Sequence, residues 1–319
     1  MKFVKNLKSL KSEDFSFAGA KATNLGRLLK IGMPVPEGFV ILTSAFERFL
    51  EKNDINVEIS TIWRKINLKD IESVEEASEI IRDLILKAKI PKDLEKEIFQ
   101  ASRALRAKYF AVRSSATTED SKIDSFAGQF ETYLNVRKED LISAVKKCWA
   151  SLYLPRVLFY RKKRKILRKK ISIGVILQKM IDAEISGVCF TSHPITQDKN
   201  QILIEAIWGL GELLVQGKVT PDSYVVEREK NSKFKILDVN VALQKKMLVR
   251  KKDETKEVLV PKTKQKAQKL SKNQIKKLTK LCLKIENYFK FPQDIEWGIF
   301  KGKFYIFQTR PITTFREIY

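Results

Sequence analysis

The sequence predicts an α+β fold built as two lobes, the first rich in helices and the second rich in strands. Most of residues 1–178 follow helical patterns, with a few short apolar strands between them. In residues 179–319, short runs of Val, Ile, Phe and Tyr recur instead, as is typical of strands. The chain has 319 residues, of which 44% are apolar, and this is enough for a sizeable core. We therefore place the boundary between the lobes at residues 178 and 179.

The first lobe begins with a helix that opens after Gly19 and covers residues 20–30. The turn "GMPVPEGF" then leads into an apolar strand, "FVIL". Further helical patterns cover residues 44–53, 59–66, 75–89, 91–108 and 139–160. Between the last two of these stand a strand that runs into a polar loop, "KYFAVRSSA", and a glycine turn with a strand, "FAGQFETYLNV".

The second lobe consists mainly of strands. Its predicted strands are "SIGVILQKM", which crosses the boundary, "ISGVCFTS", "QILIEAIWG", "DSYVVER" and "FKILDVNVAL". A helix over residues 271–288 precedes a closing pair of strands. Residues 245–269 are rich in lysine and poor in apolar residues, so we expect them to form a mobile loop.

The closing pair, "QDIEWGIFKGKFYIFQTRPIT", has a tight Lys-Gly turn and an unusual set of polar residues. Side chains two residues apart point the same way, so Asp294 and Glu296 share one face of the first strand. Gln308 and Arg310 repeat that spacing on the second strand. These residues alone leave two interpretations open: structural cross-strand ion pairs, or a binding site in a stretch apolar enough to be buried.

The chain is strongly basic, with 62 Lys and Arg against 38 Asp and Glu, which gives a formal net charge of +24. Such a charge is compatible with nucleic acid or another polyanion as a partner. The excess concentrates in "RKKRKILRKK" and in residues 245–280. The first run has no interleaved aromatic residues or glycines, unlike a platform on which single strands stack. We interpret the lysine-rich runs as solvated surface and do not expect nucleic acid, although a polyphosphate site would gain from the same field.

Cysteine usage and the N-terminus indicate the compartment. The three cysteines are far apart and form no CxxC pair, so neither a disulfide framework nor a zinc site is suggested. The N-terminal "MKFVKNLKSL" has no apolar run behind it, so it is not a signal peptide. No stretch approaches the about 20 apolar residues that a membrane span requires. We expect a cytoplasmic protein that does not associate with membranes.

The usual nucleotide fingerprints are missing. The sequence contains neither GxxxxGK[ST] nor GxGxxG, and its single histidine, His193, excludes catalytic or metal sites that need several imidazoles. The remaining polar groups suit phosphate and magnesium. Lys21 starts a helix after a glycine, and Arg113 follows an apolar strand, so both can meet an anion. Glu296 and Gln308 offer the hard oxygen ligands that magnesium prefers.

Five segments, in order, resemble the ATP-binding N-terminal domain of phosphoenolpyruvate synthases and pyruvate phosphate dikinases, which rifampin phosphotransferases share. The segments are "GAKATNLGRLLKIGMPVPEGFVI", "AVRSSATTEDSKIDSFAGQFETYLNV", "GVCFTSHPIT", "IEAIWGLGELLVQGKVTPDSYVV" and "DIEWGIFKGKFYIFQTRPIT". The resemblance spans nearly the whole chain. It implies an ATP-grasp fold, in which two lobes close on ATP, and it implies ATP and Mg²⁺ as ligands.

The resemblance also implies roles for residues of the first lobe. Lys21 matches the lysine that holds the ATP phosphates, and Arg113 matches the arginine that clamps the transferring phosphates. Gly128 and Thr132, in "FAGQFET", match the flexible loop over the phosphates.

The remaining matches concern adenine and magnesium. Gln178, in "ILQKMI", matches the hinge residue beside the adenine, with Met180 close by. The family's magnesium ligands match Glu296 and Gln308, with Asp294 as a further acid of that cluster, and its second phosphate-binding arginine matches Arg310.

In complete dikinases and synthases this domain phosphorylates a histidine on a separate swivelling domain, and a barrel domain handles pyruvate. This sequence contains neither, and His193 in "TSHPIT" lacks the Thr-Cys-His surroundings of the carrier, so we expect it to be structural or exposed. We expect a partner chain or domain with the carrier histidine and the pyruvate site. The synthase resemblance implies AMP and phosphate as products. Two alternatives stay open: a phosphotransferase that acts on a drug-like hydroxyl, or a non-catalytic nucleotide- or polyanion-binding protein.

Overall fold

The computed structural model describes residues 2–117, 131–163, 173–229 and 234–312. These residues combine helices with several sheets, so the predicted α+β class is confirmed. The chain divides into two compact units. The first contains the residues up to Arg27 together with Glu37–Met180, and the second contains Leu28–Pro36 together with the residues from Ile181 on.

The segment Leu28–Pro36 belongs to the second unit although it lies in the first half of the sequence. The backbone N–H of Ile306 donates a hydrogen bond of 2.9 Å to the carbonyl of Pro34. A contact between residues so far apart in the sequence leaves no local pattern. A single boundary at residues 178 and 179 would therefore assign Leu28–Pro36 to the first unit.

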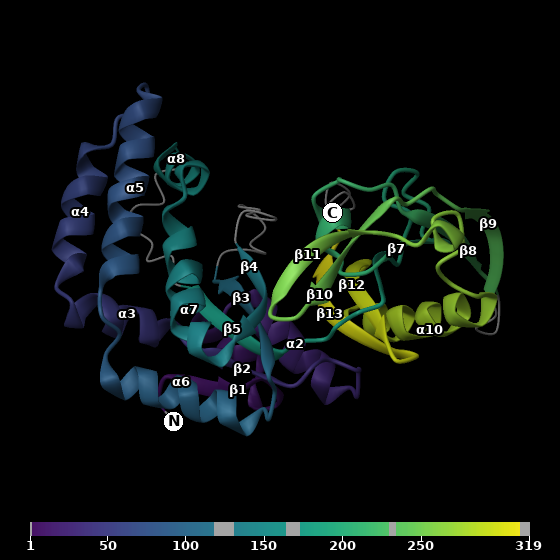
Figure 1. Cartoon of the computed structure of the whole chain (residues 1–319), viewed down its shortest axis with the longest axis horizontal. Helices are drawn as coiled ribbons and strands as arrows, with labels where there is room; N and C mark the ends of the chain where they lie inside the picture. Colours follow the sequence, from purple (N-terminus) through teal and green to yellow (C-terminus); the bar gives the residue numbers. More distant parts are fainter. Residues whose placement is uncertain (1, 118–130, 164–172, 230–233, 313–319) are drawn as a thin grey trace. The chain divides into compact units, whose positions relative to one another are not determined.

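The first unit is a five-stranded antiparallel sheet with helices packed on it, in the strand order β1-β2-β5-β3-β4 (Figure 1). Its strands are β1 (Val4–Asn6), β2 (Gly38–Ile41), β3 (Tyr109–Ala116), β4 (Thr132–Arg137) and β5 (Ile173–Lys179). Its helices are α1 (Phe15–Ala18), α2 (Ala20–Lys30, whose end enters the second unit), α3 (Thr43–Lys52), α4 (Ile55–Lys65), α5 (Ile71–Lys87), α6 (Lys92–Ala104), α7 (Leu141–Ala150) and α8 (Pro155–Lys163).

One face of this sheet forms the core of the first unit. Phe110 and Val112 of β3 and Val175 and Leu177 of β5 are buried on it, in one cluster with residues of α3, α5 and α7. Trp149 of α7 stands in the same cluster, with its ring centroid 5.3 Å from that of Phe46 and 5.0 Å from that of Phe49. Burial of large aromatic rings supplies much of the stability of such a core.

The prediction of a single helix over residues 139–160 is wrong, because α7 ends at Ala150 and α8 begins at Pro155. Proline has no backbone N–H to donate, so it fits the first turn of a helix but not the interior. Pro155 therefore begins a new helix, and the sequence contained this signal.

The second unit contains a six-stranded antiparallel sheet, in the order β13-β12-β6-β7-β8-β9, and a separate hairpin of β10 and β11. The strands are β6 (Ile185–Phe190), β7 (Gln201–Trp208), β8 (Asp222–Arg228), β9 (Phe234–Asn240), β10 (Lys246–Lys251), β11 (Glu254–Leu259), β12 (Gln293–Phe300) and β13 (Lys303–Pro311). Its helices are α9 (Glu212–Val215) and α10 (Lys272–Phe289). None of the helices in the described ranges is both long and apolar enough to cross a bilayer.

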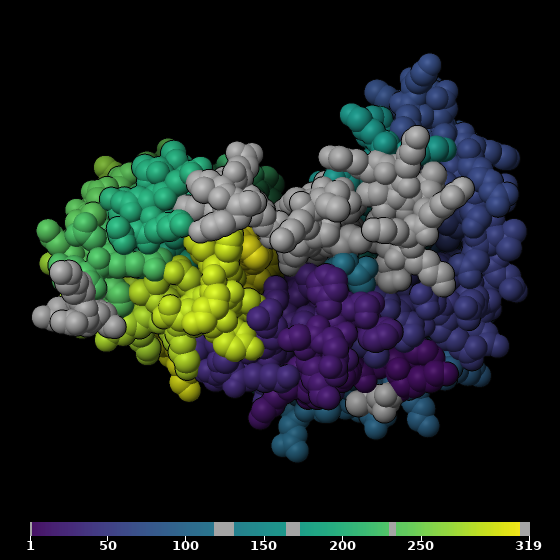
Figure 2. Space-filling model, turned by 180° about the vertical axis from the view of Figure 1, so that it is seen from behind, coloured from purple at the N-terminus to yellow at the C-terminus, as the bar shows by residue number. Residues whose placement is uncertain are grey.

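Helix α10 packs along one face of the six-stranded sheet (Figure 1). It begins with a capping box, in which Ser271 and Gln274 each satisfy a backbone N–H of the other. The residues beneath it form a directly paired row across the sheet, all fully buried: Ile295, Cys189, Ile204 and Tyr224. Since side chains alternate along a strand, the residues between these point to the opposite face. Figure 2 shows the chain from α10 to β13, coloured yellow-green to yellow, at the surface of this unit.

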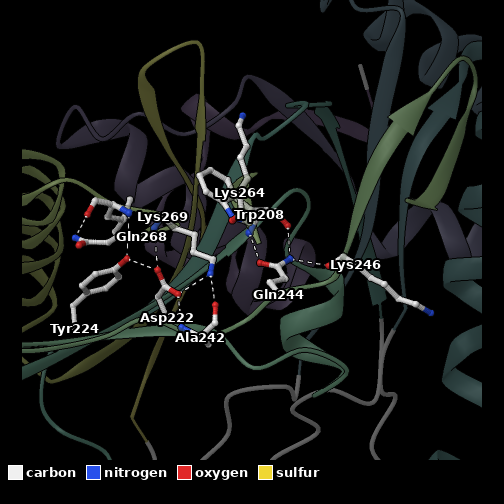
Figure 3. Close-up of polar contacts among 10 residues, drawn as sticks. Trp208, Asp222, Tyr224, Ala242, Gln244, Lys246, Lys264, Gln268 and Lys269 are labelled. Atoms are coloured by element: carbon white, nitrogen blue, oxygen red, sulfur yellow. Dashed lines mark hydrogen bonds and ion pairs between the residues drawn. The ribbon is translucent and has the colours of Figure 1, made fainter. Parts of the chain in front are cut away.

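The prediction of a mobile loop over residues 245–269 is wrong. This segment forms the β10–β11 hairpin and a 3₁₀ turn at Lys262–Lys264. The side-chain amide of Gln244 fixes its start, since Gln244 accepts from the Trp208 backbone N–H at 2.8 Å and donates to the Lys246 carbonyl at 2.9 Å (Figure 3). Lysines on exposed strand positions conceal a hairpin, because the pattern then lacks the usual apolar alternation.

A buried ion pair fixes the other end of this segment (Figure 3). The Lys269 ammonium donates to Asp222 at 2.7 Å and to the Ala242 carbonyl at 2.9 Å, and both charged side chains have no exposed surface. The Asp222 carboxylate also accepts from the hydroxyl of Tyr224 at 2.8 Å. Burial raises the pKa of Tyr224, so its hydroxyl stays protonated and remains a donor. These contacts tie β8 to the connections before β10 and before α10.

Candidate functional site

The face of the first sheet opposite the helical core carries three of the predicted site residues. Arg113 of β3 is directly opposite Thr132 of β4, and Gln178 of β5 is directly opposite Ala111 of β3. Residues two apart on a strand share a face, so Arg113, Thr132 and Gln178 all lie on this face. Gly128, the other predicted loop residue, lies outside the described residues.

The N-terminus of α2 lies against the end of β3. Gly19 has φ +80°, and a Cβ atom on it would lie 2.1 Å from the Ser115 carbonyl oxygen, so only glycine allows this approach. The Ser115 hydroxyl in turn accepts a hydrogen bond of 3.1 Å from the backbone N–H of Ala22. Through this contact Lys21, in the first turn of α2, lies near the end of the strand that carries Arg113.

Contacts at the end of β5 set the position of Gln178 and Met180. The backbone N–H of Met180 donates to the Tyr109 carbonyl at 3.0 Å, which extends the β3–β5 pairing past the end of β5. A Cβ atom on Gly38 would lie 2.7 Å from the Cγ of Gln178. The absence of a side chain on Gly38 therefore makes room for Gln178 beside β2.

The closing hairpin of the second unit brings its four polar residues into two direct pairs. Lys301 and Gly302 both have positive φ, as a two-residue type I′ turn requires. With this turn, Asp294 lies directly opposite Arg310 and Glu296 directly opposite Gln308. All four lie on the face opposite α10.

The first pair is an ion pair, and the second offers two oxygen donors. Arg310 Nε donates to Asp294 Oδ2 at 2.7 Å. Burial raises the pKa of the Asp294 carboxyl, the Arg310 charge opposes this, and the nearby Glu296 charge adds to it. Of the two interpretations of this hairpin, the structural ion pair therefore holds for Asp294 and Arg310. Glu296 and Gln308 supply a carboxylate and an amide oxygen side by side, which suits a hard cation such as magnesium.

Sequence reasoning missed Glu205 of β7. It is directly opposite Val188, which is directly opposite Glu296, so it lies on the same face as the four hairpin residues. Burial first, and then the negative charge of Asp294, raises the pKa of Glu205. A glutamate in the otherwise apolar run "QILIEAIW" was a signal, but its neighbours depend on the strand order of the sheet.

His193 has a structural environment, as the sequence predicted. Its Nδ1 accepts from the backbone N–H of Thr196 at 3.2 Å and more weakly from that of Ile195 at 3.4 Å, and its carbonyl accepts from Gln197 N–H. It therefore shapes a turn after β6. Over the parts of the chain that the structure describes, no group of three or more His, Cys, Asp and Glu side chains is arranged to hold a metal.

The sequence matches one protein family over residues 15–318, and the description of that family is "Pyruvate phosphate dikinase, AMP/ATP-binding domain". A probable phosphoenolpyruvate synthase of Archaeoglobus fulgidus is 44% identical, over 98% of this chain and 42% of its own length. The phosphoenolpyruvate synthase of Pyrococcus furiosus is 37% identical, over 99% of this chain and 44% of its own. The rifampicin phosphotransferase of Bacillus cereus is 37% identical, over 99% and 36%. The chain thus spans less than half the length of these relatives.

Proposed function

Because the chain belongs to the family of pyruvate phosphate dikinase AMP/ATP-binding domains, we propose that it binds Mg-ATP and transfers a phosphoryl group to a carrier histidine on another domain or chain. The complete reaction would be of the phosphoenolpyruvate synthase (pyruvate, water dikinase) type, in which pyruvate, ATP and water give phosphoenolpyruvate, AMP and phosphate. The observation that carries this is the direct pairing of Glu296 with Gln308 beside an arginine on one sheet face.

The residues of the two units suit different parts of the nucleotide. Arg113 and Lys21 supply positive charge for the phosphates in the first unit, with Thr132 and Gly128 as further contacts. Gln178 and Met180, at the end of β5, are the residues we assign to the adenine. Arg310 supplies a second guanidinium in the second unit, where Asp294 orients it through the ion pair.

The donor set fits magnesium. Glu296 and Gln308 are the residues that would hold it, with Asp294 as a further acid. When bound, the ion neutralises charge on the transferring phosphates, which is the main requirement of phosphoryl transfer. The protein itself orients the phosphates through Arg113, Lys21 and Arg310 and fixes their approach to the acceptor.

The test mixes the chain with a carrier domain from a related synthase and with ATP labelled at the β- or γ-phosphate. Transfer of the β-label to an acid-labile phosphohistidine, with release of AMP, is the expected result. Transfer of the γ-label with release of ADP would contradict the synthase reaction but keep the kinase. An absence of label on the carrier from wild-type protein would refute phosphotransfer.

Two other functions remain as alternatives. The identity with a rifampicin phosphotransferase favours a drug-like hydroxyl as the final acceptor, and only the acceptor domain distinguishes that function. The net charge of +24 favours a polyanion-binding module, for which the expected result is tight DNA binding without labelled carrier.

A further inference from the structure

Helix α2 begins without a side-chain cap of its own. Its first intrahelical hydrogen bond runs from the Thr23 N–H to the Gly19 carbonyl at 3.1 Å, so Gly19 occupies the N-cap position. An N-cap side chain normally accepts from one of the first backbone N–H groups of the helix, and glycine has no side chain to do so. The hydroxyl of Ser115 on β3 takes this place, since it accepts from the N–H of Ala22, three residues after Gly19.

The backbone at Gly19 explains why the cap comes from another element. Its φ of +80° and ψ of 167° lie in a region that essentially only glycine adopts. Gly174 of β5 is directly opposite Ser115, and a Cβ atom on it would lie 2.7 Å from the Ala18 carbonyl oxygen. The backbone between α1 and α2 therefore lies directly against the Ser115–Gly174 pair, where the Ser115 hydroxyl can reach it.

Ser115 connects the two residues that we assign to the phosphates in the first unit. Arg113 is two residues before Ser115 on β3, so both side chains point to the same face of the sheet. Lys21 directly precedes Ala22 in the first turn of α2. Ser115 is fully buried, and β3 is paired on both sides, with β4 and β5. The hydrogen bond to Ala22 therefore fixes Lys21 relative to the strand that carries Arg113.

We propose that Ser115 is a positioning residue for phosphoryl transfer, which caps α2 and thereby holds the Lys21 ammonium in place relative to the Arg113 guanidinium. This role rests on the proposed function, in which both cations bind the phosphates. Phosphoryl transfer depends mainly on positioning and charge, and a misplacement of about 1 Å can cost about 10²-fold in rate. An alanine at position 115 removes the acceptor of the Ala22 N–H, so the first turn of α2 can shift.

The test compares Ser115→Ala with the wild type in phosphotransfer from ATP to the carrier domain and in the binding of two ligands. These are adenylyl imidodiphosphate, a non-hydrolysable ATP analogue, and adenosine, which has no phosphates. We expect the transfer rate to fall by about 10²-fold. The affinity for adenylyl imidodiphosphate should fall about tenfold, which is the size expected for the loss of one cap. The affinity for adenosine should not change, because Lys21 and Arg113 contact only the phosphates.

Ser271→Ala is the matched control. The Ser271 hydroxyl accepts from the Gln274 N–H at 3.3 Å and so caps α10 in the same way as Ser115 caps α2. Helix α10 packs on the sheet face opposite the β12–β13 polar residues, so this variant removes a helix cap away from the proposed site. It should leave the transfer rate and both affinities unchanged.

A Ser115→Ala variant that transfers phosphate and binds both ligands like the wild type would overturn the proposal but leave the proposed function intact. An absence of transfer by the wild type would overturn both. An equal loss of affinity for adenosine would indicate general distortion of the first sheet and would also overturn the positioning role. Hydrogen exchange of the wild type needs no variant: the Ala22 amide should exchange slowly, and exchange at the rate of an exposed amide would contradict the cap.

Discussion

Replacement of Lys269 by methionine tests the buried ion pair that anchors the lysine-rich segment of the second unit. Lys269 and Asp222 have no exposed side-chain surface, and their charged atoms are 2.7 Å apart. Lys269→Met leaves the Asp222 carboxylate buried without its counter-charge. Breaking a buried pair in this way costs about 3–5 kcal/mol. The hydrogen bonds that Asp222 keeps from Tyr224 and Ala242 place the expected loss near the lower end of that range.

Urea unfolding followed by tryptophan fluorescence measures this loss. With a slope of about 2 kcal/mol per M, a loss of 3 kcal/mol lowers the midpoint by about 1.5 M. The double variant Asp222→Asn/Lys269→Met should lose less than Lys269→Met alone, because no charge then remains buried without a partner. Lys246→Met is the control, since Lys246 pairs with Glu257 on the exposed hairpin, with the two side chains 59% and 43% exposed.

An exposed pair contributes about 0–1 kcal/mol, so Lys246→Met should leave the midpoint almost unchanged. If Lys269→Met also costs less than about 1 kcal/mol, or if the double variant is less stable than Lys269→Met, the ion pair does not anchor the segment as described.

Three further predictions concern the site and its support. Arg113→Ala should lower the rate of phosphotransfer to the carrier by about 10²-fold or more. Arg113→Lys should not restore it, because a lysine cannot make two parallel hydrogen bonds to phosphate. Full activity in the lysine variant would contradict this. Gly19→Ala should destabilise the chain well beyond Gly32→Ala, since both have positive φ but only Gly19 meets the Ser115 carbonyl; equal losses on thermal unfolding would contradict the contact. Burial raises the pKa of Glu212, so the stability that its neutral carboxyl contributes is lost as the pH rises from about 4 through that raised pKa. The Glu212→Gln variant should therefore lose less stability between pH 4 and 7 than the wild type. Parallel profiles of stability against pH for the two proteins would refute this.

Local patterns in the sequence predicted what depends on neighbouring residues. Strand alternation and the Lys-Gly turn predicted the β12–β13 hairpin, and its register places Glu296 opposite Gln308. The helix over residues 271–288 agrees closely with α10, because Ser271 and Gln274 form its N-terminal capping box. Turn chemistry and caps act within a few residues, so a sequence displays them directly.

Features that depend on the order of strands in a sheet could not be predicted in the same way. Glu205 lies in a row with Glu296 only because β6 stands between β7 and β12. In the sequence, Lys269 belongs to a lysine-rich run that we interpret as surface. In the structure it is buried and forms an ion pair with Asp222, which is far away in the sequence. Pro155 is different, because the effect of a proline on a helix is local and the break before α8 could therefore be predicted from the sequence.

The most direct test of the proposed magnesium–nucleotide site is calorimetric titration of adenylyl imidodiphosphate into the folded chain, with and without Mg²⁺. We predict binding that requires Mg²⁺ and that weakens at least about tenfold in Glu296→Ala, a loss of about 1.4 kcal/mol. Binding of equal affinity in the wild type and Glu296→Ala, or no binding by folded wild-type protein, would contradict a magnesium–nucleotide site on this sheet face.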